Sequence, residues 1–317
     1  MRALPAIVAA LLTGVLGVSV EAQTAAAIPL ATAVFAADFP DPSVLRIGDV
    51  YYGYGTTTPW EAAGHIFPIL TSTDLRHWSA AGDVFGVAPS WASDHFWAPS
   101  VVAHSGTYFV YYSALMAGGD HCLAVATASN PLGPFADHGP LACDDGPDAR
   151  GFIDASPLLV GDQAYLYFSV DGPSHHSISV VPLSSDLLHV AGPRTELFGV
   201  TEAWESGVNG TVEGPSPFRW GDTFVLLYSG GDWRRDYAMG YATATSPLGP
   251  FVKQPGPFLQ GGDGLKGPGG GSFFTDSQGQ PWLAFHAWAD SGRELHVGRL
   301  SISASPAGPR VALGRSA

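Results

Sequence analysis

Three acidic residues that could share one reaction stand at matching places in this sequence. Asp41 lies in "PDPS", Asp154 in "IDAS" and Glu213 in "EGPS", each two or three residues ahead of a serine. A single Asp-Pro step is ordinary turn chemistry, because the residue before a proline is restricted and Asp tolerates tight turns. Three carboxyl groups that converge would instead raise one another's pKa values. Such a set suits glycosidic hydrolysis, in which one carboxyl protonates the leaving oxygen and another activates water.

The convergence depends on an internal repeat. Five segments share a serine, a few apolar residues, a glycine-containing turn and an aromatic-rich run. Their serines recur at nearly equal intervals and are Ser43, Ser100, Ser156, Ser216 and Ser272. Their turn glycines keep the same interval and are Gly48, Gly106, Gly161, Gly221 and Gly279. Because two independent landmarks have the same period, we interpret the chain as five equivalent units.

Each unit offers a hairpin and further short strands, which is typical of a four-stranded propeller blade. Helical periodicity is absent after the N-terminal segment, which disfavours a barrel with outer helices or a Rossmann fold. We therefore predict an all-β, five-bladed β-propeller over residues 23–317, with no second domain. The first strand of each blade should line the central channel, so residues just before the serines should ring one of its mouths. The acids then come from blades one, three and four, since Ala98 and Gly270 take the position in the other two.

Composition and the N-terminus limit the partners and the compartment. With 14 Lys+Arg against 28 Asp+Glu and a net charge of -14, the chain repels polyanions, so we expect no nucleic-acid partner. Residues 1–22 carry a basic Arg2, an apolar stretch and small residues before a cleavage site near Ala22. This pattern predicts a signal peptide and a secreted protein, extracellular or periplasmic, that has no membrane partner. A membrane anchor is the alternative, although the apolar stretch is short for a bilayer span.

Cys122 and Cys143 are the only cysteines, and a bridge between them would close a short loop. In an oxidising compartment an even count favours a disulfide, which would stabilise the fold by about 3 kcal/mol on the chain-entropy model. Two free buried thiols are the alternative, since sequence does not show that the sulfurs meet.

Other motifs offer competing chemistry. Glu202 and Glu205 compete with Glu213 for an acid role, but they precede the repeat register, and we interpret them as loop residues near the cleft. No "GxSxG" elbow precedes a helix, which disfavours a serine nucleophile. The glycine-rich run at residues 261–274 precedes a strand and lacks a "GK[ST]" ending, so we do not interpret it as a phosphate cradle.

Taken together, the segments "FPDPSVLRIGDVYYGYGTT", "HFWAPSVVAHSGTYFVYYS", "GFIDASPLLVGDQAYLYFS" and "TVEGPSPFRWGDTFVLLYSGG" resemble, in order, the blade-start motifs of glycoside hydrolase family 43. Members are secreted five-bladed propellers that act on arabinose- and xylose-containing polysaccharides with inversion. The resemblance implies that Asp41 is the general base and Glu213 the general acid. It implies that Asp154 raises the pKa of the acid and orients it. Inversion implies a base-to-acid separation of roughly 6.5 to 9.5 Å.

The sequence departs from the family pattern at two places, where Ala155 and Ser100 replace the commoner Pro and Asp. Neither position belongs to the expected trio of acids. His286 in "AFHAWAD" matches a family histidine that faces a calcium or other cation in the channel through water, and a hydrogen-bonded core histidine is the alternative. Beyond that possible cation, the chemistry requires no cofactor.

Two tryptophans are candidates for contact with a sugar. Trp97, just before "APS", could stack on a sugar ring, with packing between blades as the alternative. Trp60, in the loop after the first hairpin, is a candidate wall of the pocket. We count both, with His286, as expected substrate-binding residues.

The expected substrate is arabinan or arabinofuranosyl side chains of plant cell-wall polysaccharide. A β-xylosidase or arabinoxylan-debranching activity is the alternative among enzymes, because the acids are shared and the loops choose the substrate. A non-catalytic sugar-binding propeller is the alternative outside enzymes. Such a protein would not need three acids in register.

Overall fold

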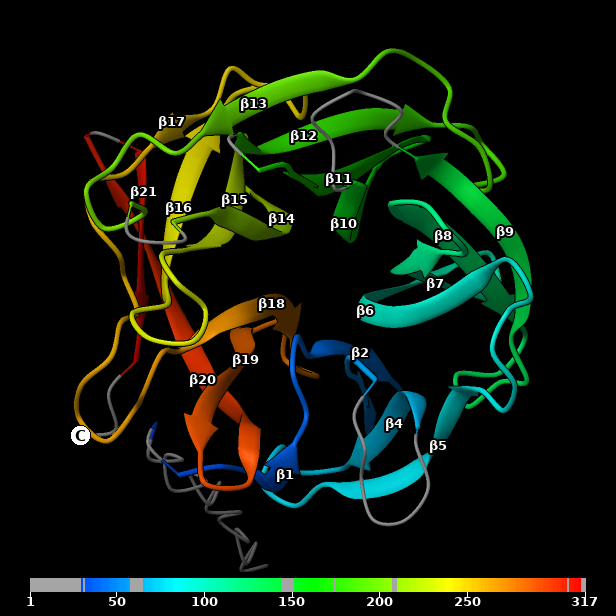
Figure 1. The fold of residues 1–317 in the computed structure, drawn as a ribbon. Helices are drawn as coiled ribbons and strands as arrows, with labels where there is room; N and C mark the ends of the chain where they lie inside the picture. Colours follow the sequence, from blue (N-terminus) through cyan, green and yellow to red (C-terminus); the bar gives the residue numbers. More distant parts are fainter. Residues whose placement is uncertain are drawn as a thin grey trace, which may run out of the picture.

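The structure, a computed structural model, describes residues 30, 32–57, 65–143, 151–173, 175–206, 210–306 and 308–314. Within these ranges the regular elements are all β-strands, arranged as sheets around a common centre (Figure 1). This arrangement is the predicted five-bladed β-propeller. Trp60 and residues 1–22, on which the pocket-wall and signal-peptide predictions rest, lie outside the described residues. In the described part of the chain, no helix has the length and apolar character needed to cross a bilayer.

Four blades follow the repeat directly. Blade one contains β2 (Ser43–Ile47), β3 (Val50–Tyr54), β4 (Ile66–Ser72) and β5 (Ser79–Phe85). Blade two contains β6 (Ala92–His104), β7 (Thr107–Met116), β8 (His121–Ala128) and β9 (Ala136–Cys143). Blade three contains β10 (Gly151–Val160), β11 (Gln163–Asp171), β12 (His176–Leu183) and β13 (Thr195–Gly199). Blade four contains β14 (Val212–Trp220), β15 (Thr223–Gly230), β16 (Ala238–Ala244) and β17 (Val252–Lys253).

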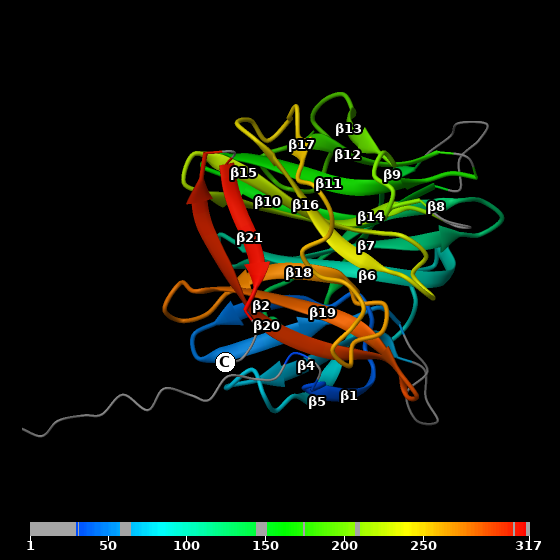
Figure 2. The same ribbon diagram turned by 90° about the vertical axis from the view of Figure 1, so that its left-hand side faces the viewer.

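Blade five joins the two ends of the described chain. It contains β18 (Gly269–Thr275), β19 (Pro281–Ala289) and β20 (Gly292–Ser305), and β21 (Gly308–Leu313) extends β20. Its outer strand is β1 (Phe35–Asp38), which comes before the first repeat and pairs antiparallel with β20. Figure 2 shows β20 and β21 rising along the side of the ring toward blade four, where β21 contacts β15 and β16. The repeat did not predict that the first strand completes the last blade.

Turn chemistry explains the hairpins at the start of each blade. The five repeat glycines all adopt left-handed backbone angles, with φ between +58° and +80° at Gly48, Gly106, Gly161, Gly221 and Gly279. This conformation is favourable for glycine and matches the twist of tight hairpins. The regular recurrence of these turns brings the first strand of each blade, such as β6 or β14, toward the centre of the ring (Figure 1).

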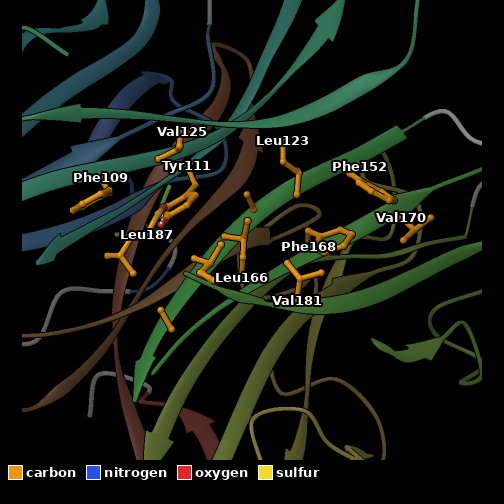
Figure 3. Close-up of a cluster of buried hydrophobic side chains, with 13 residues drawn as sticks. Phe109, Tyr111, Leu123, Val125, Phe152, Leu166, Phe168, Val170, Val181 and Leu187 are labelled. Carbon is orange, nitrogen blue, oxygen red and sulfur yellow. Dashed lines mark hydrogen bonds between the residues drawn. The ribbon is translucent and has the colours of Figure 1, made fainter. Parts of the chain in front are cut away.

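The hydrophobic core is divided among the junctions between neighbouring blades. In the described residues, five buried clusters each combine side chains of two adjacent blades. Figure 3 shows the cluster between blades two and three, where Tyr111 and Leu123 face Leu166 and Phe168. Another cluster packs Phe39 and Trp78 against side chains of blade five and so closes the ring. Apolar burial is therefore spread around the circle instead of forming one central core.

The repeat serines connect neighbouring blades. Ser43 Oγ accepts a hydrogen bond of 3.1 Å from the N–H of Val101 in blade two. Ser272 Oγ in blade five donates to the carbonyl of Pro42 at 2.6 Å, which ties the last blade to the first. These buried or half-buried bonds explain why a hydroxyl recurs at this position of the repeat.

Cys122 and Cys143 form a disulfide across β8 and β9, which confirms the bridge expected from the sequence.

Candidate active site

A pocket of about 210 Å³ opens at the centre of the ring and receives residues from all five blades. Asp41, Asp154 and Glu213 all line it, and so does Trp97. The structure therefore brings together three acids that lie far apart in the sequence, on three different blades.

A shared backbone conformation turns the same position of every blade toward this pocket. The residue two before each repeat serine has a left-handed φ between +47° and +61°, at Asp41, Ala98, Asp154, Gly214 and Gly270. In blades two to five the strand register shifts at this point, as in a β-bulge. Bulges re-aim side chains near active sites, and strained non-glycine residues cluster at functional positions. Two of the three non-glycine residues here are aspartates, which tolerate this conformation best after asparagine and glycine.

Side chains of neighbouring blades accept hydrogen bonds from the backbone N–H groups of these bulges. Ala98 N–H donates to Thr56 Oγ1 at 2.8 Å, and Gly270 N–H donates to Ser229 Oγ at 2.9 Å. In each pair the acceptor belongs to the preceding blade. The equivalent positions around the ring are Thr56, Ser113, Ser169, Ser229 and His286, which keep the period of the repeat serines. That spacing is a signal in the sequence that could have identified them as a set.

Asp41 is held from two sides. Thr56 Oγ1 donates to Asp41 Oδ2 at 2.6 Å, and the Arg293 guanidinium lies 3.8 Å from Oδ1. The backbone N–H of Asp41 donates to His286 Nδ1 at 3.1 Å. The side chain remains 23% exposed, so its carboxylate is fixed in direction but accessible from the pocket.

Asp154 accepts two hydrogen bonds at one oxygen. Gly214 N–H and Ser169 Oγ–H both donate to Oδ2, at 2.9 and 3.0 Å. These donors favour the ionised form, but burial and the negative charge of Asp41 outweigh them and raise the pKa of Asp154 to about 7. Gly214 directly follows Glu213, so this bond also connects the backbone of blade four to Asp154.

Glu213 lies between an acid and a phenol. Burial, and after it the charge of Asp154, raises the pKa of Glu213 from 4.5 to about 8. Tyr237 O–H donates to Glu213 Oε1 at 2.7 Å, which opposes part of that shift. Glu213 therefore carries a proton at neutral pH, as a group that protonates a leaving oxygen must.

His286 is fully buried on β19. Because Nδ1 accepts from the Asp41 N–H, the neutral ring carries its proton on Nε2, which has no hydrogen-bond partner among the described residues. Burial and the nearby charge of Arg293 hold the pKa of His286 well below 6.5, so the ring stays neutral. A protonated Nε2 does not fit a directly coordinated cation. Nor do the described residues contain a group of three acidic, histidine or cysteine side chains suited to a metal. The expected contact with a cation through water stays a prediction.

Trp97 lines the pocket and also packs. Its ring stacks on His121 at 4.6 Å and on His95 at 4.5 Å, both of blade two, so Trp97 packs within its own blade, and its contact with a sugar stays a prediction. Glu205, considered as a competing acid, is fully buried outside the pocket lining, where Lys253 Nζ lies 2.6 Å from its Oε2. Glu202 does not line the pocket either.

Three further pocket residues were not expected from the sequence. Trp233 and Tyr237 lie in the loop between β15 and β16, and Arg293 stands near the start of β20 beside Asp41. They occupy no register position of the repeat, so periodicity gave no indication of them.

Comparison with known proteins agrees with the fold. The chain is 26% identical over 276 residues to a β-D-galactofuranosidase of Aspergillus niger, covering 80% of this chain and 75% of that one. It is 27% identical over 273 residues to a probable arabinan endo-1,5-α-L-arabinosidase of Aspergillus fumigatus, covering 77% and 78% of the two chains. A solved endo-1,4-β-xylanase of Bacteroides thetaiotaomicron superimposes with a TM-score of 0.76 at 29% identity, over 89% of this chain and 96% of that one. The family model for glycosyl hydrolases family 43 matches residues 31–305, and the chain therefore belongs to that family.

Proposed function

We propose that this inverting glycoside hydrolase cleaves arabinofuranosyl linkages in arabinan or in arabinose-containing side chains of plant cell-wall polysaccharide. The carrying observation is that Asp41, Asp154 and Glu213 meet in one pocket, where burial and the charge of Asp154 raise the pKa of Glu213. The relative named as an arabinan endo-1,5-α-L-arabinosidase supports the choice of arabinose.

In the proposed reaction Glu213 acts as general acid. It gives its proton to the glycosidic oxygen as the bond to the anomeric carbon breaks, and the leaving sugar departs as an alcohol. Burial and the charge of Asp154 keep the proton on Glu213 at neutral pH. Asp154, tied to Gly214, orients the acid and raises its pKa.

Asp41 acts as general base on the opposite face of the sugar. Its carboxylate takes a proton from a water molecule as that water attacks the anomeric carbon, so the configuration inverts in one step. Thr56 and Arg293 hold the carboxylate in place without filling the pocket. Inversion requires the base and the acid to stand roughly 6.5 to 9.5 Å apart. The proposed chemistry uses no cofactor.

A xylan-type substrate is the second candidate, because the solved structure with a TM-score of 0.76 is named an endo-1,4-β-xylanase. Arabinan, arabinoxylan, xylo-oligosaccharides and aryl glycosides therefore form the test panel, with product anomers followed by NMR. Retention of configuration on every substrate would contradict the role of Asp41.

The acid role is tested by changing the leaving group. Glu213→Gln should lose most activity on oligosaccharides but keep it on a dinitrophenyl glycoside, whose leaving group needs no proton. Asp41→Asn should lose activity on both substrates. Glu202→Gln is the matched control, because Glu202 lies in the preceding loop outside the pocket lining and should behave as wild type. Full activity of Glu213→Gln on oligosaccharides would remove this residue from the mechanism.

We also propose that the protein is secreted to the extracellular space or periplasm after cleavage near Ala22. The disulfide between Cys122 and Cys143 supports an oxidising compartment. N-terminal sequencing of the exported protein tests the cleavage site.

A further inference from the structure

Trp233 stands at the pocket with much of its indole uncovered. It lines the same pocket as the three acids and is 39% exposed, whereas most large apolar side chains of the described residues are buried. It belongs to the loop between β15 and β16, outside the repeat register. An exposed aromatic ring in a pocket is a common feature of binding sites.

A second indole fixes its position. Trp288, near the end of β19, stacks on Trp233 with ring centroids 5.7 Å apart and planes 23° apart. Trp288 Nε1–H donates to the Trp233 carbonyl at 2.7 Å. Because both the ring and the backbone are held, a ligand that contacts Trp233 orders little side-chain freedom.

Two guanidinium groups lie over the ring of Trp233. Arg293 lies 5.2 Å from the ring centroid of Trp233 and 5.8 Å from that of Trp288, and it also lines the pocket. Arg234 lies 5.5 Å from Trp233 and is paired with the buried Asp232 at 3.3 Å. The exposed part of Trp233 beside these N–H donors matches a sugar, which carries C–H groups on one face and hydroxyls around its edge.

Arg293 also shows how close Trp233 lies to the proposed catalytic base. Its guanidinium is 3.8 Å from Asp41 Oδ1, the proposed base. A sugar on Trp233 would therefore be a direct neighbour of the sugar that reacts.

We propose that Trp233, supported by Trp288 and flanked by Arg293, forms a second sugar subsite beside the cleavage point. The proposal rests on the proposed function and deepens it, since it assigns a preference for chains over single-sugar glycosides. Contact with Trp233 adds to substrate affinity only when the substrate has a second ring to fill this subsite.

The test compares Trp233→Ala with wild type on two substrates of one sugar type, an arabinofuranosyl fluoride, which has no second ring, and arabinotriose, or their xylose counterparts if xylan is the substrate. Loss of a well-packed aromatic anchor costs about 10- to 100-fold in affinity. We expect kcat/KM to fall by that factor for the trisaccharide and to stay unchanged for the glycosyl fluoride. Trp233→Phe should recover most of the loss. Leu248→Ala removes an equally exposed apolar side chain, 39%, that does not line the pocket, and should change neither substrate.

Binding separates this proposal from the proposed function. In the Glu213→Gln background, calorimetric affinity should rise from monosaccharide to trisaccharide, and adding Trp233→Ala should abolish the rise. An equal loss on both substrates, or an unchanged rise in the double variant, would overturn the subsite. Undiminished hydrolysis by Glu213→Gln would instead overturn the acid role and leave the subsite standing.

Discussion

Replacing Gly270 with alanine tests whether the position of Asp41 controls activity. Gly270 is the blade-five member of the left-handed positions, with φ +56°, and a Cβ there would lie 2.5 Å from Asp41 Oδ1 and from His286 Cε1. Carbon and oxygen atoms in contact stand about 3.3 Å apart or more, so the carboxylate must move by about 0.8 Å. A displacement of about 1 Å from productive geometry can cost about 100-fold in rate. We expect Gly270→Ala to lower kcat by about that factor.

The backbone cost can be separated from the clash. An alanine in the left-handed region costs about 1–2 kcal/mol, which lowers Tm by about 2–3 °C in a protein of this size. Ala98 holds a methyl group in the same conformation in blade two, at φ +47°. Gly221→Ala is the matched control, because Gly221 has φ +59° and nothing within 4 Å of the new Cβ.

Gly221→Ala should therefore lose only the backbone cost by calorimetry, and Gly270→Ala should lose more, because its Cβ also meets the buried His286 ring. Only Gly270→Ala should lose kcat on the best substrate of the panel. Full activity in Gly270→Ala would refute the reasoning that the Asp41 carboxylate must stay where it is. If kcat fell equally in Gly221→Ala, the loss in Gly270→Ala would come from general destabilisation and not from the displaced carboxylate.

Three further predictions concern charge and covalent structure. Two unit charges about 6 Å apart at an effective dielectric of about 20 interact by about 3 kcal/mol, or about two pKa units. Asp154→Asn should therefore move the alkaline limb of kcat/KM, near pH 8 in wild type, down by one to two units on that estimate; an unmoved limb would show that Asp154 acts through geometry alone. Between pH 4.5 and about 8 the folded state holds a proton on Glu213 that the unfolded state releases, so wild-type stability falls as pH rises through that window. Glu213→Gln should accordingly raise Tm relative to wild type at pH 9 but not at pH 4, and a constant difference would contradict the raised pKa. The double variant Cys122→Ser/Cys143→Ser should lose about 3 kcal/mol of unfolding free energy in denaturant titration, and an unchanged midpoint would argue against the loop-entropy account.

The blades were predictable because a hairpin needs a glycine at a fixed place and a blade junction needs a hydroxyl. Gly48 and Ser43 represent these two demands in the first repeat, and both recur around the ring. The three acids could be found because each lies two or three residues ahead of a repeat serine. Asp41 looked like turn chemistry in isolation, and only the register distinguished it.

Features outside the register were not predictable. Trp233 and Arg293 reach the pocket from a loop and from the start of a strand, where no spacing constrains them. The pairing of β1 with β20 joins segments from opposite ends of the described chain, with Phe35 opposite Leu295. The environment of Glu205 was not predictable either, because the sequence around it does not show whether its carboxylate is exposed in a loop or buried against Lys253. In each case the deciding contact is tertiary.

The attachment of the first strand to the last blade has a consequence for biogenesis. A chain emerging from the ribosome carries Asp41, Asp154 and Glu213 long before it carries His286 and the strand that β1 needs. Until synthesis is nearly finished, the backbone of Asp41 has no acceptor and the circle stays open. Hydrolytic competence should thus arise abruptly, when the final blade is in place.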